Sequence, residues 1–261
     1  MRVDGDLLTF PFRDPEWQKR FLIGSAIGLG AIIFFPVIFL ITGYQLRAMR
    51  NTIHGGDPAL PDWDDVGSLL IDGLKMFLVS FVYLLPVFIL VIGMYVLMLA
   101  LGFGVFGLVA ALAEDPTVIA VGLPFAFPLF IAAFVLVGGL TTILSLFLVF
   151  MSMVAVTRML AHDDLSAAFD FREVWGLLRQ GFKYYLIAFV VQYGLGLAIG
   201  VLLQFLSLTI ILICLMPFLT GVVQMYVGLM SGTLFGMAYH QTQTNPVGTN
   251  AAPAPSEPAS V

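Results

Sequence analysis

Charged residues are scarce in this chain. Only 10% of its 261 residues are Asp, Glu, Lys or Arg, whereas 60% are hydrophobic and the mean hydropathy is +1.03. Soluble domains contain about a quarter of charged residues, so this composition excludes an ordinary soluble protein. It predicts an all-α, multi-pass membrane protein.

Cysteine and the signatures of catalysis are also missing. The single cysteine, Cys214, lies in an apolar run, which excludes an intrachain disulfide and disfavours a thiolate metal site. The sequence contains no His/Glu zinc motif, no embedded nucleophile and base, and no nucleotide signature. The net charge of −5 forms no basic stripe for nucleic acid. We therefore expect no enzyme, cofactor, metal or nucleic-acid site.

The few charges are concentrated in three islands. All eleven Lys and Arg residues lie within residues 2–20, 47–75 and 158–183, and between these islands the only charges are Glu114 and Asp115. We divide the chain into an N-terminal interfacial segment (1–20), a single membrane domain (21–240) and a tail (241–261). The tail is rich in Pro, Ala, Ser and Thr, a composition that predicts disorder.

Residues 50–82 recur without a gap at 158–190. Twelve of the 33 positions are identical, among them Arg50/Arg158, His54/His162 and Lys75/Lys183. Each copy is a charged, aromatic segment that continues directly into an apolar one. The duplication predicts a parallel internal repeat, in which both copies have the same orientation in the membrane.

The islands also predict the topology. Basic residues mark the cytoplasmic side, so the simplest arrangement places all three islands and both termini in the cytoplasm of a cell-membrane protein. We predict spans near 76–98 and 132–157, and two more within 184–240. The segment 99–131 forms either a membrane-embedded hairpin or two further spans, which makes four to six transmembrane helices.

The apolar stretch 21–46 allows two interpretations. As one helix its 26 residues would extend roughly 39 Å, enough for a single crossing that places the N-terminus outside. Pro36, which follows Gly24, Gly28 and Gly30, instead allows two short helices in a re-entrant hairpin. We favour the hairpin because it keeps the first island on the cytoplasmic side.

The islands have the pattern of amphipathic helices at the membrane surface. In the second island Asp62 is the predicted N-cap, and the apolar face comprises Trp63, Val66, Leu70, Leu74 and Phe77. The third island repeats this pattern with Phe171, Val174, Trp175, Leu178 and Phe182 on its apolar face and Asp170, Glu173, Arg179 and Lys183 on its polar face. In the first island Asp14 is the predicted N-cap and Pro15 the first helical residue.

Two sets of polar residues are candidates for function. The first is a cytoplasmic face for lipid headgroups or a protein partner: Arg50, His54, Trp63, Lys75, Arg158, His162, Trp175 and Lys183. Each Arg lies four residues before its His, so the pair forms either an anion site or the basic end of a helix, whose side chains reach the headgroups. The second set is intramembrane, Gln192, Gln204 and Gln224, which bond between helices or line a path.

Several strings in the chain resemble a known family. They are Phe10-Pro-Phe-Arg-Asp-Pro-Glu-Trp17, Gly43-Tyr44 with Arg47 and Arg50, Gly56-Asp-Pro-Ala-Leu-Pro-Asp-Trp-Asp-Asp65, Asp72-Gly-Leu-Lys75 and Ser166-Ala-Ala-Phe-Asp170. They are similar to the prokaryotic membrane family called domain of unknown function 4013, over roughly residues 6–240. The resemblance implies a polytopic helical membrane protein and carries over no catalytic residue.

Three functions compete. We rank first a non-catalytic membrane scaffold or adaptor, whose duplicated cytoplasmic face meets a protein partner or lipid. The alternative is a transporter or lipid-handling protein for a neutral solute or lipid; the parallel repeat favours it, but the spans carry no ionisable group at midplane. An intramembrane enzyme ranks last because no catalytic set is present.

Single cysteines at positions 5, 57, 115 and 164, in a chain without Cys214, test the topology. With a membrane-impermeant thiol reagent we expect 5, 57 and 164 to be labelled from the cytoplasmic side and 115 from outside. Labelling of 57 and 164 from opposite faces would contradict the parallel repeat, whereas 5 and 57 on opposite faces would contradict only the hairpin.

Overall fold

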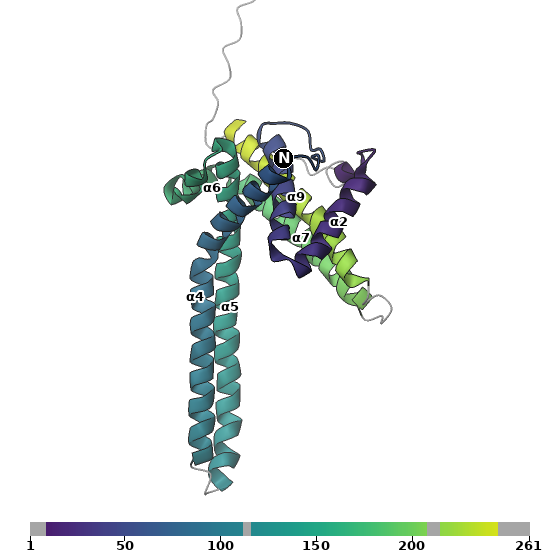
Figure 1. The fold of residues 1–261 in the computed structure, drawn as a ribbon. Coiled ribbons are helices and arrows are strands. Elements are labelled where there is room, and N and C mark those ends of the chain that lie inside the picture. The colour runs from purple at the N-terminus through teal and green to yellow at the C-terminus, as the bar shows by residue number, and fades with distance from the viewer. Residues whose placement is uncertain (1–8, 112–115, 208–214, 245–261) are drawn as a thin grey trace, which may run out of the picture. The chain divides into compact units, whose positions relative to one another are not determined.

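The structure, a computed structural model, describes residues 9–111, 116–207 and 215–244. Cys214, the Glu114–Asp115 turn and the part of the tail after Thr244 lie outside these ranges. Every regular element within them is a helix (Figure 1). The elements are η1 (Phe10–Phe12), α2 (Trp17–Ile33), η2 (Phe35–Val37), α3 (Ile38–Ile53), α4 (Val66–Ala111), α5 (Pro116–His162), η3 (Leu165–Phe169), α6 (Phe171–Gln180), α7 (Phe182–Ser207) and α9 (Met216–Thr244).

Four helical segments are long and apolar enough to cross a membrane. They are Val66–Gly104, Phe130–His162, Phe182–Ser207 and Met216–Thr244. They confirm, as helices of suitable length and hydropathy, the predicted spans near 76–98 and 132–157 and the two within 184–240. The described part of 99–131 contains no separate helix, because its glycines continue α4 while Pro124 and Pro128 lie inside α5. Apolar helices tolerate such residues where neighbouring groups satisfy the freed backbone.

Residues 21–46 form two helices rather than one. α2 ends at Ile33, Phe34 is extended (φ −131°, ψ 93°), and Pro36 lies in the 3-10 turn η2 before α3 begins. The fixed φ of proline and its missing N–H favour a new helix start at this point. α2 and α3 then pack against each other. With 17 and 16 residues, each extends about 25 Å, less than the ~30 Å hydrocarbon core.

The two matching aspartates, Asp170 and Asp62, have different roles at the starts of α6 and α4. Asp170 caps α6, where its carboxylate accepts the Glu173 N–H at 3.3 Å. The prediction that Asp62 caps the other helix is wrong, since α4 begins at Val66 and Asp65 accepts the Ser68 N–H at 3.2 Å. Asp62 lies in the preceding loop, where an ion pair described below holds it.

The start of α2 also differs slightly from the prediction. The helix begins at Trp17 rather than at Pro15. Asp14 still satisfies the first free backbone donors, because its carboxylate accepts the Glu16 N–H at 2.7 Å and its carbonyl accepts the Trp17 N–H at 3.1 Å.

Contacts divide the chain into two compact units. The second unit, Ser80–Ser152, consists of the later part of α4 and the earlier part of α5 (Figure 1). Its apolar side chains are mostly exposed, as at Leu136 with an exposed fraction of 74%. An exposed apolar helix surface of this kind is what a lipid environment solvates.

The first unit, Met1–Val79 with Met153–Val261, is organised around α9. Helices α2, α3 and α7 all pack on α9. The α9 residues Leu229, Met230, Leu234 and Phe235 are fully buried. Of the four candidate spans, α9 buries the largest share of its residues.

Glycines on α9 bring α3 into close contact. Gly228, Gly232 and Gly236 are four residues apart and therefore share one helix face. A Cβ at Gly232 would lie 2.8 Å from the Gln45 carbonyl oxygen, and one at Gly236 would lie 2.7 Å from the Met49 carbonyl oxygen. Small residues at this spacing let two membrane helices approach until their backbones touch.

This contact predicts a steric effect of one methyl group. Gly236→Ala should lower the free energy of unfolding by about 1–3 kcal/mol, because the new Cβ forces α3 and α9 apart. Gly194→Ala on α7 is the matched control, since a Cβ there meets no atom within 4 Å. Denaturant titration of the purified proteins, followed by circular dichroism, measures both. Equal stability of the two variants would contradict the close contact.

Candidate functional site

The charged islands meet in the first unit. Arg20 of α2 binds Asp62 at 2.7 Å and the Leu60 carbonyl oxygen at 2.6 Å, which joins the first island to the second. Arg50 of α3 binds Asp163 at 2.9 Å, which joins the second island to the third. The Arg50–Asp163 pair thus links residues 50–75 with residues 158–183, and we call these two segments together the polar face.

The loop between α3 and α4 is held by side chains of α3. Tyr44 donates a hydrogen bond to the Pro61 carbonyl oxygen at 2.8 Å, and its ring stacks on Trp63 with centroids 4.1 Å apart. Arg47 binds the Asp64 carboxylate and donates to the Ser68 hydroxyl at 2.9 Å. Trp63 thus lies in a tertiary contact before α4 begins. The prediction that it belongs to the apolar face of a helix is wrong. These bonds give a segment without regular structure a defined shape.

The duplicated arginines both face carboxylates. Arg50 contacts Asp163, and Arg158 lies 3.9 Å from both Asp170 and Glu173 and donates to the Ala167 carbonyl oxygen at 3.3 Å. The two histidines are exposed: His54 is the C-cap of α3 and His162 is the last residue of α5. Each Arg–His pair therefore lies at the C-terminal end of a helix, where positive charge is favourable.

α6 has one buried and one exposed apolar side. Val174, Leu177 and Leu178 are buried, whereas Phe171 and Trp175 are 55% and 39% exposed. The Arg179 guanidinium lies 5.2 Å from the centre of the Trp175 ring. Lys183 is exposed at the start of α7, and Lys75 lies 3.9 Å from Asp72. The outer side of α6 thus combines aromatic rings with positive charge.

Several carboxylates of the polar face serve as local caps. Hydrogen bonds from the Ser166 hydroxyl and N–H hold the pKa of Asp164 below its usual range, and Ser68 lowers the pKa of Asp65 in the same way. Among the described residues, no three His, Cys, Asp or Glu side chains are placed to hold a metal ion.

Two of the three predicted glutamines line one cavity. The cavity has a volume of about 190 Å³, and Gln192 of α7 and Gln224 of α9 line it together with Gln45 of α3. Gln45 donates to the Gln224 carbonyl oxygen at 3.4 Å. Gln204 is exposed and does not line this cavity. Sequence reasoning missed Gln45, although a glutamine in an apolar run two residues before Arg47 was a usable signal.

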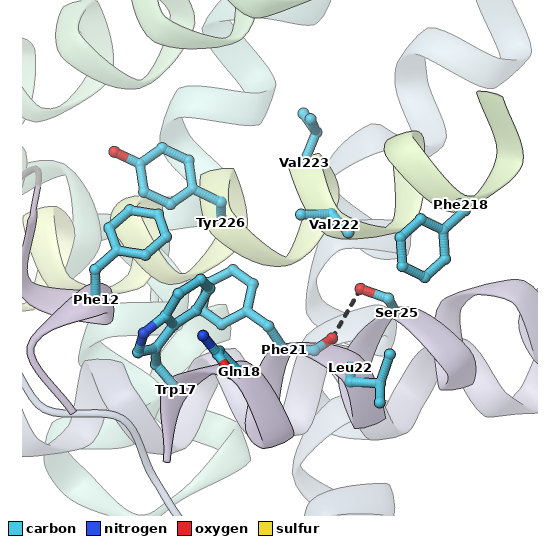
Figure 2. Close-up of a pocket in the computed structure, with 10 residues that line it drawn as sticks. All are labelled: Phe12, Trp17, Gln18, Phe21, Leu22, Ser25, Phe218, Val222, Val223 and Tyr226. Carbon is cyan, nitrogen blue, oxygen red and sulfur yellow. Dashed lines mark hydrogen bonds between the residues drawn. The ribbon is translucent and has the colours of Figure 1, made fainter. Parts of the chain in front are cut away.

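A second pocket lies between α2 and α9 and is almost entirely apolar (Figure 2). Its volume is about 380 Å³, and aromatic rings of Phe12, Trp17, Phe21 and Tyr226 surround it. The Ser25 hydroxyl in its wall already donates to the Phe21 carbonyl oxygen at 2.7 Å (Figure 2). The pocket therefore offers apolar contact and no charged group.

The comparisons with known proteins identify a family and a relative, and neither has an assigned activity. A family model described as a protein of unknown function (DUF4013) matches residues 26–208. An uncharacterised protein of Methanocaldococcus jannaschii, MJ1189, is 29% identical over 91 residues. That match spans 32% of this chain and 32% of the relative. No solved structure matches the chain.

The ion pairs of Arg20 predict a loss of stability when they are removed. Arg20→Gln should lower the free energy of unfolding by roughly 1–3 kcal/mol, because Asp62 and the Leu60 carbonyl lose a charged donor. Arg172→Gln, which changes an exposed arginine of α6, should change it by less than about 0.5 kcal/mol. Thermal unfolding in one detergent compares the two variants. If Arg20→Gln were as stable as Arg172→Gln, these pairs would not hold the loop.

Proposed function

Since the chain belongs to the family of unknown function DUF4013, we propose its function from its own geometry: a non-catalytic membrane scaffold or adaptor that binds a soluble protein through its polar face. The family match over residues 26–208 confirms the resemblance carried by the sequence strings. The Arg50–Asp163 pair carries the proposal, because it links the two charged segments.

Preorganisation supports this proposal. A surface whose loops are already held loses little conformational entropy when a partner binds. Three arginines form ion pairs that hold the loops: Arg20, Arg47 and Arg50. Other polar groups are exposed and accessible to a partner, such as His54, His162 and Lys183. Exposed charges at the edge of a protein interface govern partner selection and association rate more than affinity.

The same proposal includes an orientation in the cell membrane. The exposed rings of Phe171 and Trp175, with Arg179 next to Trp175, fit the headgroup level, where aromatic and basic side chains favour the interface. We place the polar face and both termini in the cytoplasm. The break at Pro36 fits a re-entrant α2–α3 hairpin, and the recurrence of residues 50–82 at 158–190 fits a parallel repeat.

A second function has an observation in its favour. The cavity lined by Gln45, Gln192 and Gln224 could receive an uncharged molecule, as a protein that handles neutral solutes or lipids requires. Its small volume and the missing charge at midplane disfavour coupled ion transport. We rank this function below the scaffold.

Site-directed photo-crosslinking in native membranes tests the scaffold. A photoreactive residue at position 54 or 162 should form an adduct with one soluble protein, whereas the same residue in place of Leu136 should react only with lipid. The double variant Arg172→Glu with Lys183→Glu should reduce the protein adduct several-fold, because it reverses exposed charge on the polar face.

The matched control for the double variant is Gln204→Leu, which should leave the adduct unchanged because Gln204 is exposed elsewhere on α7. Adducts with lipid alone at all three positions would exclude a protein partner. If the yield of the protein adduct were unchanged by the charge reversal, the polar face would be excluded as the binding site.

A further inference from the structure

We propose that the cavity between α3, α7 and α9 binds an uncharged amphipathic molecule of the diacylglycerol type, with a hydroxyl-bearing end and an apolar tail. This inference is independent of the scaffold and its protein partner. For the second proposed function, the handling of a neutral solute or lipid, it names the chemical class of the ligand.

The polar end of the ligand would meet carboxamides and hydroxyls. Besides Gln45, Gln192 and Gln224, the cavity wall includes Thr42 and Ser231. The Gln192 Oε1 atom is buried and has no hydrogen-bond partner among the described residues. An unpaired buried polar atom costs about 1–3 kcal/mol, and a hydroxyl donor from a ligand would remove that cost. Carboxamides both donate and accept, so they suit hydroxyl groups.

Charge excludes the other common ligand classes. None of the residues that line this cavity is ionisable, and its polar members are Thr42, Gln45, Gln192, Gln224 and Ser231. A phosphate or ammonium group would therefore be buried without a counter-charge, which is strongly unfavourable. A neutral ligand carries no such cost.

The tail would lie in adjoining apolar space. A neighbouring cavity of about 450 Å³ shares Thr42, Gln45 and Gln224 with the first one and continues along Gly196 and Gly200 of α7. A Cβ at either glycine would meet no atom within 4 Å. These two glycines thus leave room beside the glutamines that no helix of the described chain fills.

Native mass spectrometry of the full chain, with dioctanoylglycerol as the probe, tests the site. We expect one bound dioctanoylglycerol per chain and much weaker binding of dioctanoyl phosphatidate, which has the same tails and a charged end. Gln192→Leu should weaken dioctanoylglycerol binding about tenfold, as the loss of one to two hydrogen bonds implies. Gln204→Leu is the matched control on the same helix and should bind as the native chain does.

A second variant keeps the test valid if Gln192→Leu does not fold. Gly200→Leu leaves all glutamines in place and should block the tail space, so it should also weaken binding. Equal binding by the Gln192→Leu and Gln204→Leu proteins, or equal binding of the phosphatidate, would overturn the proposal. So would a dimer that Gly200→Leu dissociates, because the glycine face would then contact a second copy. None of these outcomes depends on the crosslinking to a soluble protein.

Discussion

The contact between α3 and α9 is the interaction on which the first unit depends. Gly232 and Gly236 let α9 touch the α3 backbone, so the position of α3 is set by atoms that cannot move aside. This contact therefore also positions the α3 side chains that bind the loops of the polar face, namely Tyr44, Arg47 and Arg50. The same contact places Gln45 opposite Gln224. One helix pair therefore supports both the loops and the cavity.

Arginine has a structural task in this protein. Arg20, Arg47 and Arg50 each connect an apolar helix to an acidic loop, and two of them bind backbone carbonyls in addition to carboxylates. A guanidinium suits this task because it stays charged and presents several donors in one plane. The acidic residues around them would otherwise repel one another. This division of charge explains why a chain with so few ionisable groups keeps most of them in three short segments.

Much of the fold follows from local sequence signals. Long apolar runs predicted the four spans, and Pro36 predicted the break between α2 and α3. Gly55, with its φ of +80°, follows the end of α3, where glycine is the usual residue. The failures have a tertiary cause. Asp62 has the local pattern of an N-cap, yet Arg20, forty-two residues away, holds it in a loop, and Trp63 stacks on Tyr44 instead of continuing a helix face. The partners of Gln45 and Gln192 also come from distant helices. The glycine spacing on α9, by contrast, was readable in the sequence and indicates a close helix contact.

The central place of α9 has a consequence for biogenesis. A ribosome makes the chain from its N-terminus, so α2, α3 and α7 are synthesised before the helix on which they pack. Until α9 arrives, the α3 surface formed by Gln45, Met49 and Thr52 has no glycine face opposite it. Assembly of the first unit is therefore a late event, and the earlier helices must remain separately stable until α9 has been made.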